Sequence, residues 1–232
     1  GYNLLHQNVH SGGVFHNSNF VKGGTVQFVN TLKKIAESKN VEIKTSSAVA
    51  CINVKNETCF GITLENGELI KADKIVSGLD QNNTFFNLVG SSKLNPSFAR
   101  QLRNIKYRGS SARIHFALSG LPRINGIQEN QMETVFSIGP SIAYLERTSD
   151  SVKYGKLSDN PFVEFTLPSI LNPDFAPSGK HVLSATIQYA PYHLRSQTWS
   201  EELNVQLKDN VVKVLENYIP NISSMIESSY VL

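Results

Sequence analysis

The sequence predicts a mixed α/β and α+β protein, in which a helix and a β-meander precede a mainly antiparallel sheet covered by helices. Three observations support this fold class. A glycine-led segment has apolar residues at helical spacing, and short β-rich runs separated by turn-forming residues follow it. Farther along, several strand-like segments follow one another without long helices between them, which is typical of an antiparallel sheet.

The first predicted element is an amphipathic helix from Thr25 to Ser38. Asn40 tolerates the left-handed backbone with which many helices end. Gly23 and Gly24 directly precede the helix. Because glycine has no side chain, the backbone N–H groups at this helix start can approach an anionic or flat ligand closely. The apolar face consists of Val29, Leu32 and Ala36, widened by Val26 and Phe28.

A strand at Val41–Thr45 and then a β-meander are predicted after this helix. The turns of the meander lie at Lys55–Thr58 and at Glu65–Glu68, and the Asn-Gly dipeptide of the second is a strong hairpin signal. The last strand runs toward Ser77 and Gly78. The strands of the meander are expected at Ala48–Val54, Cys59–Leu64 and Ile70–Val76.

Two short helices are predicted next, one at Thr84–Val89 and one capped by Asn95 with Pro96 as its first residue. A later helix follows Thr198-x-x-Glu201, which has the spacing of a capping box, and it is stopped by Pro220. The expected strands are Ser111–Ser119, Thr134–Ile138, Ser141–Leu145, Val163–Leu167 and His181–Tyr189. We expect two domains, residues 1–92 and 93–232, divided near the Gly-Ser-Ser at 90–92.

The composition excludes several classes of protein. With 40% hydrophobic and 18% charged residues and a net charge of +3, the chain has the composition of a globular protein without a nucleic-acid footprint. No run of about 20 apolar residues indicates a transmembrane span, and no leader indicates a signal peptide. Cys51 would pair with Ile62 rather than with Cys59, so no disulfide is expected. This fits a reducing, cytoplasmic setting. The oligomeric state is not predicted.

The histidines raise the question of a metal or substrate site. His6, His10 and His16 have no cysteine or carboxylate near them, so no metal site is predicted. We interpret them as loop residues, with the alternative that one lines a substrate cavity. His115 lies on the polar side of the strand Ser111–Ser119 and is a candidate substrate contact. A histidine on a solvated sheet face is the alternative.

Several motifs together resemble a known family. These are the helix and Val-Glu-Ile-Lys-Thr at 41–45, Gly61-Ile-x-Leu, Asn66-Gly67-x-x-Ile, and Ala72-Asp73-x-Ile-Val-Ser, with Ala176-Pro177-Ser-Gly179 and Gln188-Tyr189-Ala-Pro191 farther on. This sequence pattern, which extends over nearly the whole chain, resembles that of FAD-dependent oxidoreductases of the phytoene desaturase and amine oxidase type. Within that family the likeness is greatest to the pyridine nucleotide-disulphide oxidoreductase domain-containing protein 2 subfamily.

The resemblance implies a partial FAD-binding, NAD(P)-binding Rossmann-like domain with a β-meander, followed by a substrate-binding domain. It places Gly23 and Gly24 near the flavin, the Val49 backbone at the adenine, and Ser77 and Gly78 near the adenosine half. The sequence departs from the family pattern at Thr25, where methionine is frequent, and at Gly78, where asparagine is frequent. These departures weaken side-chain roles but leave backbone contacts in place.

No Gly-x-Gly-x-x-Gly turn occurs in the chain, and no nucleophile-and-base set stands out. We therefore expect the central fragment of a larger flavoprotein, which by itself neither retains FAD nor turns over. The whole protein is expected to transfer a hydride from an apolar or amine-like small-molecule substrate to FAD. Its catalytic residues are not predicted. The alternative is a non-catalytic binding or scaffold module with a fold derived from a flavoenzyme.

Overall fold

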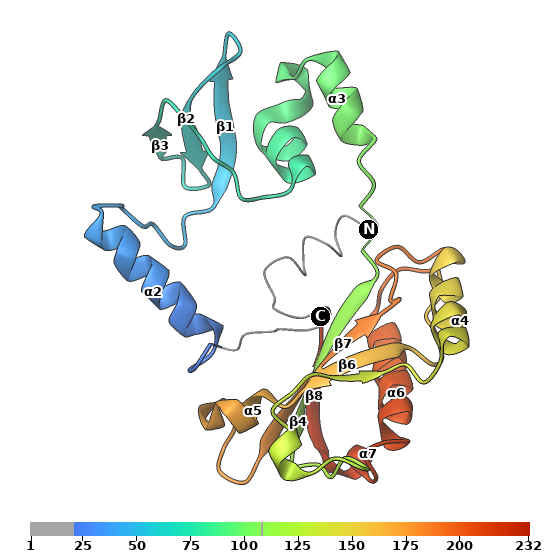
Figure 1. Ribbon diagram of the computed structural model, residues 1–232. Helices are drawn as coiled ribbons and strands as arrows, with labels where there is room; N and C mark the ends of the chain where they lie inside the picture. The colour runs from blue at the N-terminus through green and yellow to red at the C-terminus, as the bar shows by residue number, and fades with distance from the viewer. Residues whose placement is uncertain (1–20, 108) are drawn as a thin grey trace. The chain divides into compact units, whose positions relative to one another are not determined.

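The computed structural model describes residues 21–107 and 109–232, and the chain divides into two compact units (Figure 1). The small unit comprises residues 35–107. Of the described residues, the large unit comprises 21–34 and 109–232. The two domains expected from the sequence, 1–92 and 93–232, stay a prediction.

Helix α2, Thr25–Ser38, has the predicted bounds. It begins directly after Gly24, and Asn40 has a positive φ of 60° just beyond its end. None of its residues is buried. Phe28, Val29 and Leu32 are each half exposed or more, so no described part of the chain covers the apolar face of α2.

The predicted meander is confirmed as a three-stranded antiparallel sheet in the order β1-β2-β3. Asn56 and Glu57 have φ values of 48° and 61°, which is the geometry of a tight two-residue hairpin. In the second turn, Gly67 has a φ of 87° and the Asn66 side chain accepts a hydrogen bond from the Glu68 N–H at 2.9 Å. The strands are β1 Val49–Lys55, β2 Thr58–Leu64 and β3 Leu69–Lys71.

The register of this hairpin differs from the prediction by one residue. Cys51 pairs with Thr63 rather than with Ile62, because Phe60 is an extra residue in β2 and forms a bulge. The register was predicted by counting residues outward from the turn, and such a count cannot detect a bulge. Cys51 and Cys59 are both free thiols, as expected.

The predicted strand at Val41–Thr45 is wrong, and the strand predicted at Ile70–Val76 is confirmed only for Ile70 and Lys71, which belong to β3. Residues 41–45 and 72–78 have no regular secondary structure. A strand needs a neighbour for its backbone groups. Apart from one bond, from the Ala72 N–H to the carbonyl oxygen of Phe60 in β2, neither segment is paired with a described strand. Ile43 of the first segment and Val76 of the second are exposed accordingly, at 43% and 96%.

The short helices of the small unit follow the meander. The helix predicted at 84–89 is the π-helix η1, Asn82–Gly90, which packs against β1. The 3₁₀ turn η2, Ser91–Lys93, leads to α3, Pro96–Arg103. Asn95 caps α3 as predicted, since its side chain accepts a hydrogen bond from the Ser97 N–H at 2.9 Å.

The large unit contains the predicted antiparallel sheet, with five strands in the order β5-β6-β7-β4-β8. Its strands are β4 Ser111–Leu118, β5 Phe136–Ile138, β6 Phe162–Thr166, β7 His181–Gln188 and β8 Ile226–Val231. Its helices and turns are η3 Glu129–Gln131, α4 Ile142–Lys153, α5 Pro168–Leu171, η4 Pro173–Phe175, α6 Glu201–Glu216 and α7 Ile222–Met225.

One face of this sheet carries the core. Ile114, Val163 and Leu183 are fully buried on adjoining strands, together with Leu207 and Val211 of α6. Figure 1 shows α6 along one side of the sheet. The alternation predicted for β4 is confirmed, because Ala112, Ile114, Phe116 and Leu118 are buried and the residues between them are not.

Three details differ from the sequence prediction. Ser141–Leu145 is not a strand but the start of α4, because the Ser141 side chain accepts a hydrogen bond from the Tyr144 N–H and caps a helix. Helix α6 is capped by Ser200 rather than by Thr198. Strand β8 was not predicted, and it pairs with β4 at the edge of the sheet.

Replacing Phe165 by alanine should lower the free energy of unfolding of the large unit by about 3–5 kcal/mol. Its ring is only 2% exposed and stacks on Phe136 at a centroid distance of 5.0 Å, so the change leaves a cavity. Urea unfolding followed by the fluorescence of Trp199, the single tryptophan, measures this.

The matched control is Phe28→Ala on α2, where the ring is 56% exposed. This change should alter the same unfolding free energy by less than about 0.5 kcal/mol. Equal losses for the two variants would show that the core is not where the burial places it.

Candidate functional site

The glycine pair before α2 is held by contacts within the large unit. Gly23 and Gly24 have φ values of 80° and 81°, which glycine adopts without strain. The Gly23 N–H donates to Asn172 Oδ1 at 2.6 Å, and the Gly24 N–H donates to the carbonyl oxygen of Val21 at 2.8 Å. Both backbone donors expected to face a ligand are therefore bonded inside the chain.

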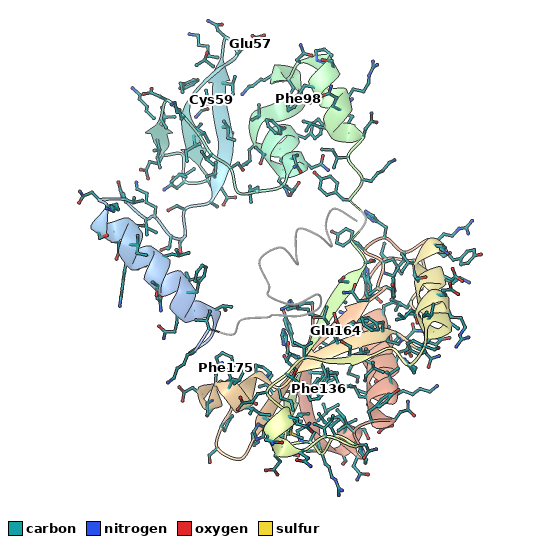
Figure 2. The ribbon with its side chains drawn as sticks, viewed as in Figure 1. Glu57, Cys59, Phe98, Phe136, Glu164 and Phe175 are labelled. Carbon is teal, nitrogen blue, oxygen red and sulfur yellow. The ribbon has the colours of Figure 1, made fainter. Side chains whose placement is uncertain are left out.

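A second contact explains why Gly24 has no side chain. Phe175, labelled in Figure 2, is the last residue of η4. A β-carbon added to Gly24 would lie 2.5 Å from Cζ of the Phe175 ring. Neither Asn172 nor Phe175 is predicted from the sequence as a partner of the glycine pair. A signal close to this region was the resemblance of Ala176-Pro177-Ser-Gly179, which directly follows Phe175, to the family.

The remaining cofactor candidates lie in the small unit. Val49 is the first residue of β1, which pairs with β2 on one side only. Ser77 Oγ lies 2.8 Å from Thr84 Oγ1 and accepts a hydrogen bond from the Leu79 N–H at 3.2 Å. Gly78 has no atom within 4 Å of a β-carbon position. Since β1 packs against η1, these positions share one unit, whereas the glycine pair belongs to the other.

Asp80 closes the segment that contains Ser77 and Gly78. Its carboxylate accepts hydrogen bonds from the backbone N–H of Asn83 at 3.0 Å and from the Asn83 side-chain amide. Both bonds lower the pKa of Asp80 below its ordinary value. The bond from the Asn83 backbone N–H has the larger effect, and the bond from the Asn83 side chain has the smaller one. The charged carboxylate therefore fixes the start of η1 beside Gly78.

His115 lies on β4, an interior strand of the large sheet. It is half buried on β4, opposite Ser184 of β7 on one side and Tyr230 of β8 on the other. Its ring has no hydrogen-bond partner among the described residues. Within residues 21–107 and 109–232, no group of three metal-ligating side chains occurs. His6, His10 and His16 lie outside the described residues.

A cavity that the sequence analysis did not predict lies at one end of the large sheet. It has a volume of about 640 Å³ and is lined by the starts of β4 and α6, the end of β8 and the 190–199 loop. The Trp199 indole N–H donates to the carbonyl oxygens of Pro191 and Tyr192, at 3.2 and 3.1 Å, so its ring forms a fixed wall. Trp199 also packs against the core of the large unit.

At these positions the protein can offer main-chain groups to a flavin nucleotide, rather than reactive side chains. The open surface over Gly78 is compatible with a flat adenosine-like group. The Gly23 N–H fits less well, because a ligand would have to replace Asn172 as its acceptor.

In the part of the chain described here, no helix is long and apolar enough to cross a membrane.

Comparison with known proteins assigns the family. The model of the family described as "Flavin containing amine oxidoreductase" matches residues 5–230, so the chain belongs to this family. The mouse (Mus musculus) "Pyridine nucleotide-disulfide oxidoreductase domain-containing protein 2" is 26% identical over 231 residues, which cover 95% of this chain and 40% of that protein. A lycopene-forming phytoene desaturase of a Paracoccus species is 26% identical over 178 residues, covering 77% of this chain and 33% of that protein.

The fold agrees with this assignment. The crystal structure of an oxidoreductase from Methanosarcina mazei matches 90% of this chain and 42% of its own chain, with a TM-score of 0.60 and 17% identity. The likeness shows a shared fold. The chain spans about 40% of the length of the mouse and rat relatives that it matches. The expected flavoenzyme family and mixed fold class are confirmed.

Gly24→Ala should undock the glycine pair from the loop that contains Asn172. The change forces a side chain into left-handed backbone, which costs about 1–2 kcal/mol, and pushes its β-carbon into the Phe175 ring. Hydrogen exchange of the Gly23 amide, measured by NMR, should accelerate by about tenfold or more.

Gly179→Ala is the matched control, because Gly179 has a similar φ of 77° but open space around a β-carbon. It should leave the exchange of the Gly23 amide unchanged. Adding Phe175→Ala to Gly24→Ala should slow the exchange again by removing the ring. Wild-type exchange in Gly24→Ala would contradict the packing described.

Asn83→Ala should raise the pKa of Asp80 part of the way toward its ordinary value, because the side-chain bond is lost and the backbone bond remains. In the wild-type chain this pKa is lower folded than unfolded. The stabilisation is therefore complete above the unfolded pKa and is lost as the pH falls through the folded pKa.

A pH titration of the Asp80 carboxyl carbon by NMR measures both values. Asn66→Ala changes an asparagine that caps a separate turn, and it should leave the pKa of Asp80 where it is. A pKa of Asp80 that does not move in Asn83→Ala would mean that the side-chain amide contributes nothing to holding the carboxylate.

Proposed function

We propose that the whole protein containing this chain is an FAD-dependent oxidoreductase that transfers a hydride from an apolar or amine-like substrate to FAD. The observation that carries this proposal is the match of the flavin-containing amine oxidoreductase family to residues 5–230, which include parts of both units. The isolated chain, which has no Gly-x-Gly-x-x-Gly turn, is proposed not to turn over.

FAD, when bound, supplies the hydride acceptor, and the protein supplies binding and orientation. The proposal gives the small unit the adenosine part of that binding, through the backbone of Val49 and the open surface at Ser77 and Gly78. Asp80 and Thr84 hold this segment in place through their bonds to Asn83 and Ser77. Gly23 and Gly24 are proposed to lie near the flavin, with Gly23 exchanging its Asn172 contact for the ligand.

The uncovered surfaces of the chain support the same proposal. Helix α2 buries none of its apolar residues, and the extended segments at 41–45 and 72–78 lack partner strands among the described residues. A helix with one apolar stripe and two strand-like segments are the parts from which a parallel nucleotide-binding sheet is built. The longer relatives contain enough additional sequence to complete such a sheet.

The test is to purify the whole protein and to measure its yellow flavin absorbance. Gly78→Val should lower the affinity for FAD by about tenfold, since overpacking costs roughly 1–3 kcal/mol. The chain itself should tolerate this change, because nothing lies within 4 Å of a β-carbon at Gly78.

Gly120→Val is the matched control. A β-carbon there has only an ordinary contact, 3.9 Å from Cε of Met225, and Gly120 belongs to no proposed cofactor site. It should leave the flavin content unchanged. A whole protein without flavin absorbance would contradict the proposed function, and normal flavin binding by Gly78→Val would contradict the placement of the adenosine.

A further inference from the structure

The face of the large sheet opposite the core is polar, and the register of the strands defines it. Arg113 of β4 and Glu164 of β6 both pair with Thr186 of β7. Directly paired residues point to the same side of a sheet. The face, called the polar face below, carries Ser111, Arg113, His115, Ala117, Ser137, Phe162, Glu164, Thr166, Val182, Ser184, Thr186, Gln188, Ser228 and Tyr230.

The middle of the polar face is built from short side chains. Thr166, Ser184 and His115 form one row across β6, β7 and β4, and Thr186 lies in the neighbouring row. All four are half buried. The face contains no lysine and no aspartate, so its middle consists of three hydroxyl side chains and one imidazole rather than a full set of long charged side chains.

Two opposite charges flank this floor. Arg113 and Glu164 lie on either side of Thr186, two strand spacings or about 10 Å apart between backbones. The Arg113 guanidinium forms no ion pair or hydrogen bond with another described residue. Glu164, which Figure 2 labels on β6, accepts one hydrogen bond, from Ser137 Oγ at 3.3 Å. As far as the described residues go, both charges therefore keep most of their bonding capacity free for a ligand.

We infer that the polar face binds a small molecule that carries both a carboxylate and an amine, with the carboxylate at Arg113 and the ammonium group at Glu164. A guanidinium takes a carboxylate through two parallel hydrogen bonds, and a carboxylate takes an ammonium group through a charge-assisted one. The hydroxyl groups of Thr186 and Ser184 contact the part of the ligand between its charges. That the bound molecule is the substrate rests on the proposed function. Of the two classes of substrate proposed there, the inference selects the amine-like one over the apolar one.

The test uses ε-aminocaproate as the probe, added to the 232-residue chain, with binding followed through the NMR shifts of the Ser184 and Thr186 amides. Hexylamine and hexanoate each lack one charge, and hexanol lacks both. The expected order of affinity is ε-aminocaproate first, the two singly charged compounds weaker by about tenfold each, and hexanol last.

Arg113→Gln and Glu164→Gln should each weaken ε-aminocaproate binding by about tenfold. They should also abolish its advantage over hexylamine and hexanoate, respectively. Arg147→Gln on α4 and Glu216→Gln on α6 are the controls, because both residues are exposed and absent from the polar face. Neither control should change the affinity.

Exchanging the two charges gives a test that a merely structural role would not pass. Arg113→Glu and Glu164→Arg should each lose binding, and the double variant should regain it, because the ligand can bind in the reverse direction. A double variant as weak as the single ones would overturn the assignment. The absence of any NMR shift change when ε-aminocaproate is added to the wild-type chain would also overturn it, because the face would then only be solvated. Tighter binding of hexanol than of ε-aminocaproate would overturn it as well.

These measurements involve no flavin and no turnover, so they fail separately from the proposed function. A whole protein without flavin absorbance contradicts that function and leaves the polar face as a binding site of unassigned purpose. Normal flavin absorbance with no binding of ε-aminocaproate overturns the inference alone.

Discussion

The burial of one face of the large sheet by α6 is the constraint on which the arrangement of the large unit depends. Ile114, Val163 and Leu183 are fully buried under Val211 and its neighbours. Since successive side chains of a strand point to opposite faces, this single choice fixes the direction of every second residue on β4, β6 and β7. His115 is thereby placed on the other face, beside residues that are distant in sequence.

The sequence predicted most elements that have a clear local pattern, and it failed for two segments whose structure depends on a distant partner. Helix α2 and the two meander hairpins formed where expected, because their hydrogen bonds are local. The segments at 41–45 and 72–78 have strand composition but no neighbour to pair with. Strand β8 is the reverse case, since pairing with β4 makes a strand of a sequence without clear alternation.

The candidate site shows the same limit. Spacing and resemblance drew attention to Gly23 and Gly24, but their partner Asn172 lies 149 residues from Gly23. No local pattern joins positions so far apart. The contact between Gly24 and Phe175 also gives this glycine a packing reason that is independent of any ligand. A glycine motif in a sequence therefore indicates close approach without saying whether a ligand or a neighbouring side chain approaches.

The surface proposed for FAD uses main-chain groups, and the polar face uses side chains. The two surfaces therefore tolerate different substitutions. The positions proposed for FAD would act through their backbone, so they would constrain side-chain size more than side-chain chemistry, as the open space at Gly78 illustrates. The polar face acts through side chains on a rigid sheet whose other face holds the core. Substitutions at Arg113, His115 or Glu164 can therefore alter ligand choice while the buried residues between them keep the strands in register.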